Sequence, residues 1–351
     1  MRLRGIPDAS RTTSSATPGR WITSVRRARS VAVAFGLILL LGPGAGEAAP
    51  SSSASRIRYL ISSGVRYLYL ADIAAHFGMR YEPAGRRFVL SSRYSLLTFT
   101  QDSTEAIVNG TRVHLSDAPW TAHGQALVAD VDFRLLLSPI LTAKDLRRGN
   151  VRRVLIDPGH GGKDPGTLGR RHPEKEITLQ VARRLEKELT ARGYQVALTR
   201  TRDQNLALEA RTQHARTWKA DVFVSLHCNA APATVRGIEI FRASPEGARS
   251  TYGTRRATGA SINSPWDADN ARLAYDIQKN VIAATGAGDR GVRNARFAVL
   301  RDCPCPAVLV EMGFLSNTAD EANLASAAYQ TNLARGIAEG ISRYDACLPP
   351  R

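Results

Sequence analysis

The 351-residue chain lacks an apolar run long enough to stay in a membrane comfortably as a spanning helix, and it has only four cysteines. Two neighbouring cysteines, Cys303 and Cys305, do not by themselves make a zinc site. They are also too close in sequence for an easy mutual bridge. We therefore expect any disulfide formed after export to involve Cys228 or Cys347. A structural or idle role is the expectation for all four.

A basic run with interleaved aromatic residues is also absent, although the net charge is +17, from 48 basic and 31 acidic residues. Charge alone allows a nucleic acid as partner, and it allows another anionic polymer equally well. The hydrophobic fraction of 43% excludes a disordered chain. The length is sufficient for two domains with cores of their own.

The first fifty residues have the order of a secretory signal. Arginines at 26, 27 and 29 precede eleven apolar residues, 31–41, and small residues suited to cleavage follow near Ala48 or Ala49. We expect residues 1–49 to be a signal peptide and the mature protein to act in the periplasm, the cell envelope or the medium. An uncleaved anchor is the alternative, and the arginine pair is only a weak indication of twin-arginine export.

Residues 56–142 are predicted to form a small α+β domain of short strands and helices. Helices are expected over 70–77 and 130–137, and Asn109-Gly110 is a strong hairpin signal. The strand–helix–hairpin opening and the VNG turn resemble the copper-amine-oxidase-N-like stalk domain of exported bacterial proteins. That resemblance implies a non-catalytic accessory module and no copper. A basic linker, 143–150, follows.

From residue 151 strands and helices alternate. Strands are expected at VRRVLID, YQVALTR, DVFVSLH, GIEIF, FAVLR and AVLVEMGF, and helices over 177–192, 206–219, 270–284 and 328–344. This alternation predicts an α/β fold with a mostly parallel sheet covered by helices on both faces. In such sheets ligands bind beyond the carboxyl ends of the strands.

Four side chains are expected at that edge. His160 follows the first strand, His227 ends the third, Glu311 lies near the end of the last, and Glu174 precedes the first long helix. Two imidazoles and one carboxylate match the ligands of a catalytic zinc with an open fourth position. A second carboxylate could then act as general base.

Each residue also has a plainer interpretation. His160 could fill a turn, His227 could be a core histidine, and Glu174 could be a carboxylate that favours a helix start. His172 could replace Glu174 as a ligand. Glu311 is harder to dismiss, because a carboxylate after a buried strand needs a partner.

Six motifs occur in an order that resembles the zinc-dependent N-acetylmuramoyl-L-alanine amidases of bacterial cell walls. They are DPGHGGKDPG, EKEITL, SLHCNA, RGIEIF, FAVLR and PAVLVEMGFLSN, and they extend over about 151–344. The resemblance implies a catalytic domain over 151–346 with one zinc ion, the ligands His160, Glu174 and His227, and the catalytic residue Glu311. Cys228 departs from the usual small residue. Some relatives place an inhibitory helix near residues 242–270; here the composition favours a mobile loop.

The implied reaction is hydrolysis of the amide that joins N-acetylmuramic acid to L-alanine of the stem peptide in peptidoglycan. Peptidoglycan rather than nucleic acid is then the expected partner, and the sequence identifies no activator protein. The glycines of DPGHGG would let the loop carry His160 to the metal, and Asp157 would either orient an imidazole or cap the turn. The alternatives are an inactive wall-binding protein and a zinc peptidase that cuts within the stem.

Overall fold

The computed structural model describes residues 57–351, so the expected signal peptide lies outside the described residues. The first part of this chain consists of short antiparallel strands and short helices. The strands are β1 (Tyr59–Ser62), β2 (Val65–Tyr69), β3 (Arg80–Ala84), β4 (Arg87–Ser91), β5 (Leu96–Thr100), β6 (Glu105–Val108), β7 (Thr111–His114), β8 (Trp120–Ala122) and β9 (Gln125–Ala129); the helices are α1 (Leu70–His76), α2 (Asp130–Asp132), the π-helical η1 (Phe133–Leu137) and α3 (Ser138–Leu141). Asn109 and Gly110 have φ angles of 48° and 82°, as a two-residue hairpin turn requires.

The second part alternates strands and helices, as expected. Its strands are β10 (Arg153–Pro158), β11 (Gln195–Leu198), β12 (Val222–Asn229), β13 (Ile238–Ala243), β14 (Asp289–Ala295) and β15 (Ala307–Phe314); its helices are α4 (Glu174–Ala191), α5 (Leu208–Trp218), the 3-10 turn η2 (Ser264–Trp266), α6 (Asp267–Thr285), α7 (Ala298–Arg301), α8 (Thr318–Ala325) and α9 (Ala327–Cys347). One expected element is wrong. FAVLR was predicted as a strand, but it forms the short helix α7, and the strand is β14 just before it. A short apolar run does not reveal its period, and Val299 and Leu300 are buried in the helix as they would be in a strand.

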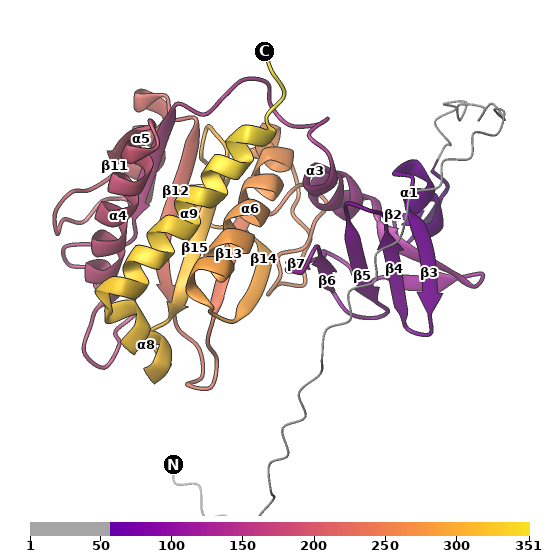
Figure 1. Cartoon of the computed structure of the whole chain (residues 1–351), viewed down its shortest axis with the longest axis horizontal. Coiled ribbons are helices and arrows are strands. Elements are labelled where there is room, and N and C mark those ends of the chain that lie inside the picture. The colour runs from indigo at the N-terminus through magenta and orange to yellow at the C-terminus, as the bar shows by residue number, and fades with distance from the viewer. Residues whose placement is uncertain (1–56) are drawn as a thin grey trace, which may run out of the picture. The chain divides into compact units, whose positions relative to one another are not determined.

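The strands form a sheet of four in the order β1-β2-β9-β8 and a sheet of eleven in the order β11-β10-β12-β15-β13-β14-β7-β6-β5-β4-β3 (Figure 1). In the larger sheet β11, β10, β12 and β15 are parallel neighbours. β13 then runs antiparallel to β15, and β14 is parallel to β13. The carboxyl ends of β10, β12 and β15 therefore lie together at one edge.

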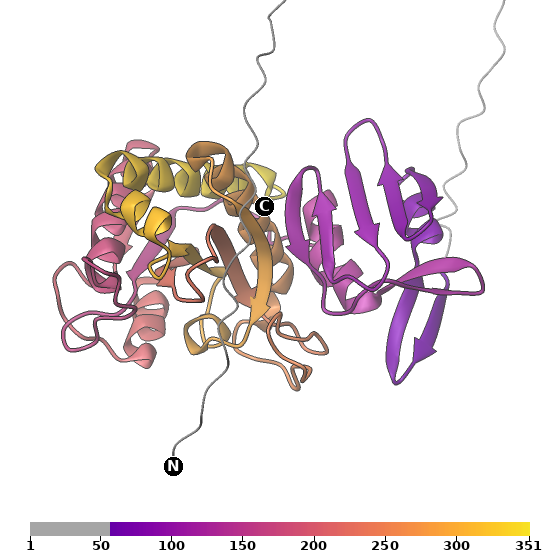
Figure 2. The same cartoon turned by 90° about the horizontal axis from the view of Figure 1, so that it is seen from below.

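Helices cover both faces of the parallel strands, which confirms the expected fold class (Figures 1 and 2). Alternate residues of a strand point to opposite faces. Val224 and Val310 pack in a core cluster with α4, α6 and α9. Phe223 and Leu309 belong to a second cluster with α5 and α7. No helix within residues 57–351 has the length and apolar character needed to cross a membrane.

The two parts share one sheet, because β7 pairs in parallel with β14 at Val113 and Val292 (Figure 1). The backbone of Arg112 donates to Asp289 Oδ2 at 2.8 Å. The ring Nε2 of His114 lies 3.0 Å from the carbonyl of Arg290. The expected accessory region therefore extends the sheet that carries the catalytic motifs.

Within the polar stretch 242–270, residues 244–263 contain no helix, and η2 and the start of α6 follow them. The path of residues 244–263 is held by ion pairs from Arg249 and Arg256 to Asp117, at 3.3 and 2.7 Å. The backbone of Gly247 also donates to Ala257 at 2.9 Å. The segment that we expected to be mobile is therefore tethered to the N-terminal part.

The four cysteines are free thiols. Cys303 and Cys305 are nearest to each other, with 3.7 Å between their sulfur atoms, and both are buried in the cluster of α5 and α7. Cys228 lies in the opposite cluster. The expected pairing with Cys228 or Cys347 is therefore absent from this structure.

Candidate metal centre

The loop after β10 carries His160 to the carboxyl edge of the sheet. His160 has φ 59°, in the left-handed region. A Cβ atom on Gly159 would collide with the ring of His227, and one on Gly166 would collide with both His160 and Glu174. Glycine is required at these two positions because the candidate metal donors occupy the space that a side chain would need.

Glu174 is the first residue of α4, which begins three residues earlier than the predicted Ile177. Its carboxylate is buried and faces the sheet edge. Oε2 accepts a hydrogen bond from the backbone of Thr167 at 2.8 Å, and Oε1 accepts one from the backbone of Cys228 at 2.9 Å. These two amides fix the carboxylate where the histidines converge.

The side chains of His160, Glu174 and His227 offer three ligand atoms within 4.8 Å of one another. His160 Nε2 lies 3.1 Å from Glu174 Oε1, and His227 Nδ1 lies 2.9 Å from the same oxygen. His172, the alternative ligand, instead lines a separate hollow with Arg171 and Glu321. The structure therefore brings together the three residues expected as ligands and leaves His172 outside.

The electrostatics of this cluster suit a divalent cation. Burial alone would raise the pKa of the Glu174 carboxyl, but hydrogen bonds from His160 and His227 outweigh it and hold the pKa well below its usual range. A carboxylate that stays ionised beside two imidazoles is a donor set that zinc favours, and three protein donors leave a fourth position open. The residues present therefore fit a catalytic zinc.

Asp164 is a site residue that the sequence analysis missed. Its Oδ2 lies 2.7 Å from His160 Nδ1, the ring nitrogen that faces away from Glu174. A carboxylate in this position fixes the tautomer and orientation of a metal-binding imidazole. The available signal was the spacing in HGGKD, which puts an acidic residue four positions after His160.

Asp157, which we considered for that orienting role, has a different one. It forms a buried ion pair with Arg211 at 2.7 Å and accepts hydrogen bonds from Thr199 and Ser225 at 2.6 and 2.8 Å. Arg211 also donates to the carbonyl of His160 at 3.0 Å. Asp157 therefore stabilises the loop through Arg211 and makes no hydrogen bond to an imidazole.

Glu311 lies on β15 directly opposite His227 of β12. Its side chain is buried, and Oε2 has no hydrogen-bond partner among the described residues. Burial raises the pKa of this carboxyl well above its ordinary value, and the nearby charges of Glu174 and Glu239 add to the effect. An unpartnered carboxyl oxygen with a raised pKa at a ligand-binding edge is typical of a proton-transfer group.

A cleft of about 460 Å³ adjoins both Glu311 and the histidines. Its polar residues are Asp157, His160, Asp164, Arg211, His227 and Glu311, and the remaining lining residues are Leu206, Ala207, Leu208, Phe297, Ala298, Val299 and Leu309. The candidate metal site therefore opens into a space with a largely apolar wall from α5 and α7.

On the side of Glu311 away from His227 lies a second buried carboxylate, Glu239 of β13. It accepts hydrogen bonds from Arg290 at 2.8 Å and from the hydroxyl of Tyr252 at 3.1 Å, and Arg293 lies 2.9 Å away. Tyr252 belongs to the tethered segment 244–263. That segment therefore reaches from the N-terminal part to the neighbour of Glu311.

The chain is similar in sequence to known proteins of one family. The family model described as N-acetylmuramoyl-L-alanine amidase matches residues 154–343. The amidase LytC of Bacillus subtilis (strain 168) is 35% identical over 191 residues, which cover 54% of this chain and 35% of LytC. The sporulation-specific N-acetylmuramoyl-L-alanine amidase of the same organism is 37% identical over 193 residues, covering 54% of this chain and 67% of that protein.

Two further similarities cover the same region. The amidase AmiC of Neisseria meningitidis serogroup B is 32% identical over 223 residues, which cover 56% of this chain and 54% of AmiC. The solved catalytic domain of CwlV, an N-acetylmuramoyl-L-alanine amidase from Bacillus (Paenibacillus) polymyxa var. colistinus, has 35% sequence identity and a TM-score of 0.47, with 55% of this chain and 97% of that chain covered. The chain thus spans about a third to two thirds of the length of these curated relatives.

Proposed function

The chain belongs to the N-acetylmuramoyl-L-alanine amidase family, and from this premise we propose that it hydrolyses the amide between the lactyl group of N-acetylmuramic acid and L-alanine of the stem peptide in peptidoglycan. The observation that carries the proposal is the convergence of His160, Glu174 and His227 within 4.8 Å, beside the buried carboxyl of Glu311. These groups come from the loop after β10, the end of β12, the strand β15 and the start of α4, and His160, His227 and Glu311 line one cleft.

We propose that His160, Glu174 and His227 hold one zinc ion per chain. When bound, zinc supplies Lewis-acid polarisation of the scissile carbonyl and lowers the pKa of water. Asp164 keeps His160 Nε2 turned toward Glu174 by its contact with Nδ1. The backbone amides of Thr167 and Cys228 hold the Glu174 carboxylate in place, so the three donors are positioned before any substrate arrives.

Glu311 is the proposed general base. Its unpartnered Oε2 accepts a proton from the attacking water and then delivers it to the nitrogen of the leaving L-alanine. Burial keeps bulk water from competing for this oxygen, and it also raises the pKa of the carboxyl, which makes its ionised form a stronger proton acceptor.

The remaining organisation is proposed from the sequence. Residues 1–49 act as a signal peptide, and the mature protein works outside the cytoplasm on peptidoglycan. Residues 56–142 form a stalk-like accessory module, residues 143–150 a linker, and residues 151–346 the amidase domain.

Incubation of the purified protein with a defined muropeptide, followed by mass analysis of the products, tests the function. Release of the intact stem peptide with a free L-alanine amine is the expected result. Fragments cut within the stem would indicate a zinc peptidase instead. An unchanged substrate, bound but not cleaved by the zinc-loaded protein, would indicate an inactive wall-binding protein.

A further inference from the structure

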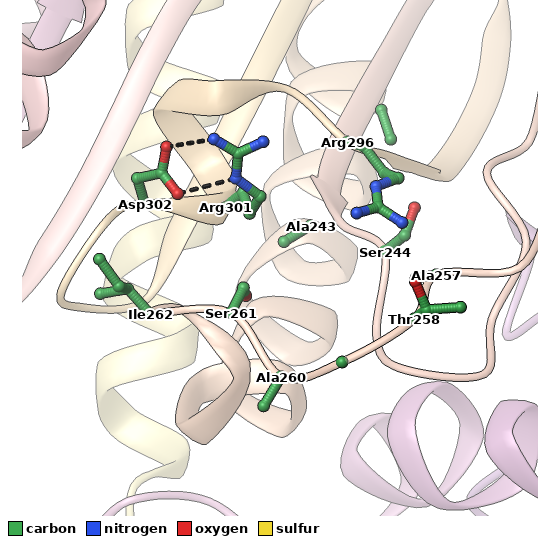
Figure 3. A pocket seen from close by; sticks show the side chains of 12 residues that line it. Ala243, Ser244, Ala257, Thr258, Ala260, Ser261, Ile262, Arg296, Arg301 and Asp302 are labelled. Atoms are coloured by element: carbon green, nitrogen blue, oxygen red, sulfur yellow. Dashed lines mark hydrogen bonds and ion pairs between the residues drawn. The ribbon is translucent and has the colours of Figure 1, made fainter.

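A second hollow, of about 280 Å³, lies between the tethered segment and the turn that joins β14 to α7 (Figure 3). One wall consists of residues 257–262, and the other contains Arg296, Arg301 and Asp302. Ala243, Ser244 and Ala295, at the ends of β13 and β14, complete the lining. No part of the proposed mechanism uses this hollow.

The hollow carries one uncompensated positive charge. Arg301 is neutralised by Asp302, which it contacts at 2.8 and 2.6 Å. Arg296 has no hydrogen bond or ion pair with any residue in the described part of the chain, and its side chain is exposed. Figure 3 shows its guanidinium beside Ser244, across the hollow from the Arg301–Asp302 pair.

Hydroxyl groups extend the polar surface around that charge. Ser244, Thr258 and Ser261 all line the hollow. A guanidinium offers several donors in a fork that matches a carboxylate, and hydroxyl donors can complete its coordination. The polar groups of the hollow therefore suit a carboxylate better than a cation.

The hollow adjoins the cleft of the candidate metal site through consecutive residues. Arg296 lines the hollow, and the next residue, Phe297, lines the cleft together with His160 and Glu311. The ring of Phe297 packs on the ring of Phe241 in β13 at a centroid distance of 5.2 Å. The two spaces are therefore lined by consecutive residues of the turn between β14 and α7.

We propose that the hollow at Arg296 is a subsite for a carboxylate of the stem peptide. The proposal rests on the proposed function, because it takes the scissile amide to lie at the metal site. An extended peptide advances about 3.3–3.6 Å per residue, and we place the second or third stem residue beside Arg296. The subsite would make the enzyme sensitive to amidation of stem carboxyl groups, which removes their negative charge.

Binding of a product tests the subsite without any turnover. A free stem tripeptide of L-alanine, D-glutamate and diaminopimelate has no lactyl amide to cleave. Its dissociation constant would be measured by calorimetry for the zinc-loaded wild type, for Arg296→Gln and for Arg216→Gln. Arg216 is a matched control, because it is exposed on α5, makes no ion pair in the described chain and lines neither space.

Loss of one charge-assisted contact should weaken binding roughly ten-fold in Arg296→Gln and leave Arg216→Gln unchanged. Two further tripeptides, one amidated at the second residue and one at the third, identify the carboxylate that contacts Arg296. The tripeptide that lacks this carboxylate should bind wild type and Arg296→Gln equally. Equal affinity of wild type and Arg296→Gln for the unamidated tripeptide would overturn the subsite.

A cleavage assay separates this failure from failure of the proposed function. With an unamidated muropeptide, Arg296→Gln should have a roughly ten-fold higher KM and an unchanged kcat, since the metal donors and Glu311 are intact. Absence of cleavage by the wild type would defeat the proposed function, while the calorimetric result would still decide whether the carboxylate binds.

Discussion

At the scale of single residues, three donors share one small volume although 14 and 53 positions separate them along the chain. Each imidazole contacts the Glu174 carboxylate, which the backbone amides of Thr167 and Cys228 also hold in place. Removal of either histidine should therefore affect metal binding first and the fold much less.

We expect His160→Ala and His227→Ala to lose zinc and amidase activity together. Both would be measured on the same samples, by metal analysis and by muropeptide cleavage. His172→Ala is the control, because His172 lies in a different hollow and should leave the zinc content unchanged. Stoichiometric zinc in both purified ligand variants would exclude this ligand set.

Glu311→Gln should reduce kcat by about 10² to 10⁴-fold, the usual contribution of a positioned general base. The amide keeps the shape of the side chain but cannot accept the proton at Oε2. Zinc content should stay near one per chain, because the three donors are untouched. Near-normal turnover would assign the proton transfer to another group, and loss of zinc would make Glu311 a ligand.

The sequence predicts the residues of the candidate site better than the contacts that hold them in place. His160, Glu174, His227 and Glu311 follow from their motifs and from strand ends at one edge. The buried ion pair of Asp157 with Arg211 does not, because a basic residue on a helix gives no sign in the sequence that its guanidinium is buried.

At the scale of elements, α7 and segment 244–263 depart most from expectation. Both depend on tertiary contacts that a local pattern does not contain. Val299 and Leu300 fill the space beside α5 in a single helical turn, whereas the polar segment is fixed by Asp117, more than a hundred residues earlier in the chain. Periodicity predicts the long helices α4, α6 and α9, because their apolar faces repeat over several turns.

Asp117→Asn should release the tethered segment. The variant loses the charge that pairs with Arg249 and Arg256, so amide exchange at Gly247 and Ala257 should become faster. The hollow at residues 257–262 is then less well formed, and KM for a muropeptide should rise several-fold with little change in kcat.

The control for this variant is Asp102→Asn. Asp102 pairs with Arg86, but both side chains are more than half exposed, so the pair should contribute little. If amide exchange in segment 244–263 is equally fast in Asp117→Asn and in wild type, the ion pairs of Asp117 do not hold this segment.

The junction of β7 and β14 should make stability depend on pH through His114. Burial, followed by the charge of Arg293, lowers the pKa of His114 to about 4, from 6.5 in the unfolded chain. Below pH 6.5 the unfolded chain binds a proton that the folded protein excludes, so the contribution of neutral His114 is complete above pH 6.5 and is lost as the pH falls toward 4.

His114→Gln keeps a donor for the Arg290 carbonyl but does not titrate. The free energy of unfolding of both proteins would be measured by urea titration. Relative to the variant, the wild type should lose up to about 3 kcal/mol of this free energy between pH 7.5 and pH 4. A difference that stays constant with pH would mean that His114 is not held neutral at the junction.

At the scale of the whole molecule, the shared sheet makes the N-terminal part more than an attached module. Its strand β7 covers the edge of β14, and its Asp117 holds the segment that brings Tyr252 to Glu239. The proposed metal donors and the proposed base all lie after residue 151, whereas segment 244–263, part of which lines the hollow at Arg296, is tethered to the N-terminal part.

A protein that starts at Gly149 should keep amidase activity on soluble muropeptides and lose part of it on intact cell wall. It retains His160, Glu174, His227 and Glu311, so zinc content should stay near one per chain. The truncation also uncovers β14 and frees segment 244–263. Its KM on soluble substrate should therefore match that of Asp117→Asn in the full-length protein. Any further loss of activity on intact wall would measure wall attachment by the accessory region. Complete loss of activity in a folded, zinc-loaded truncation would show that the N-terminal part contributes to catalysis itself. Wild-type activity of the truncation on intact wall would show that the N-terminal part has no role in cleavage or in wall attachment.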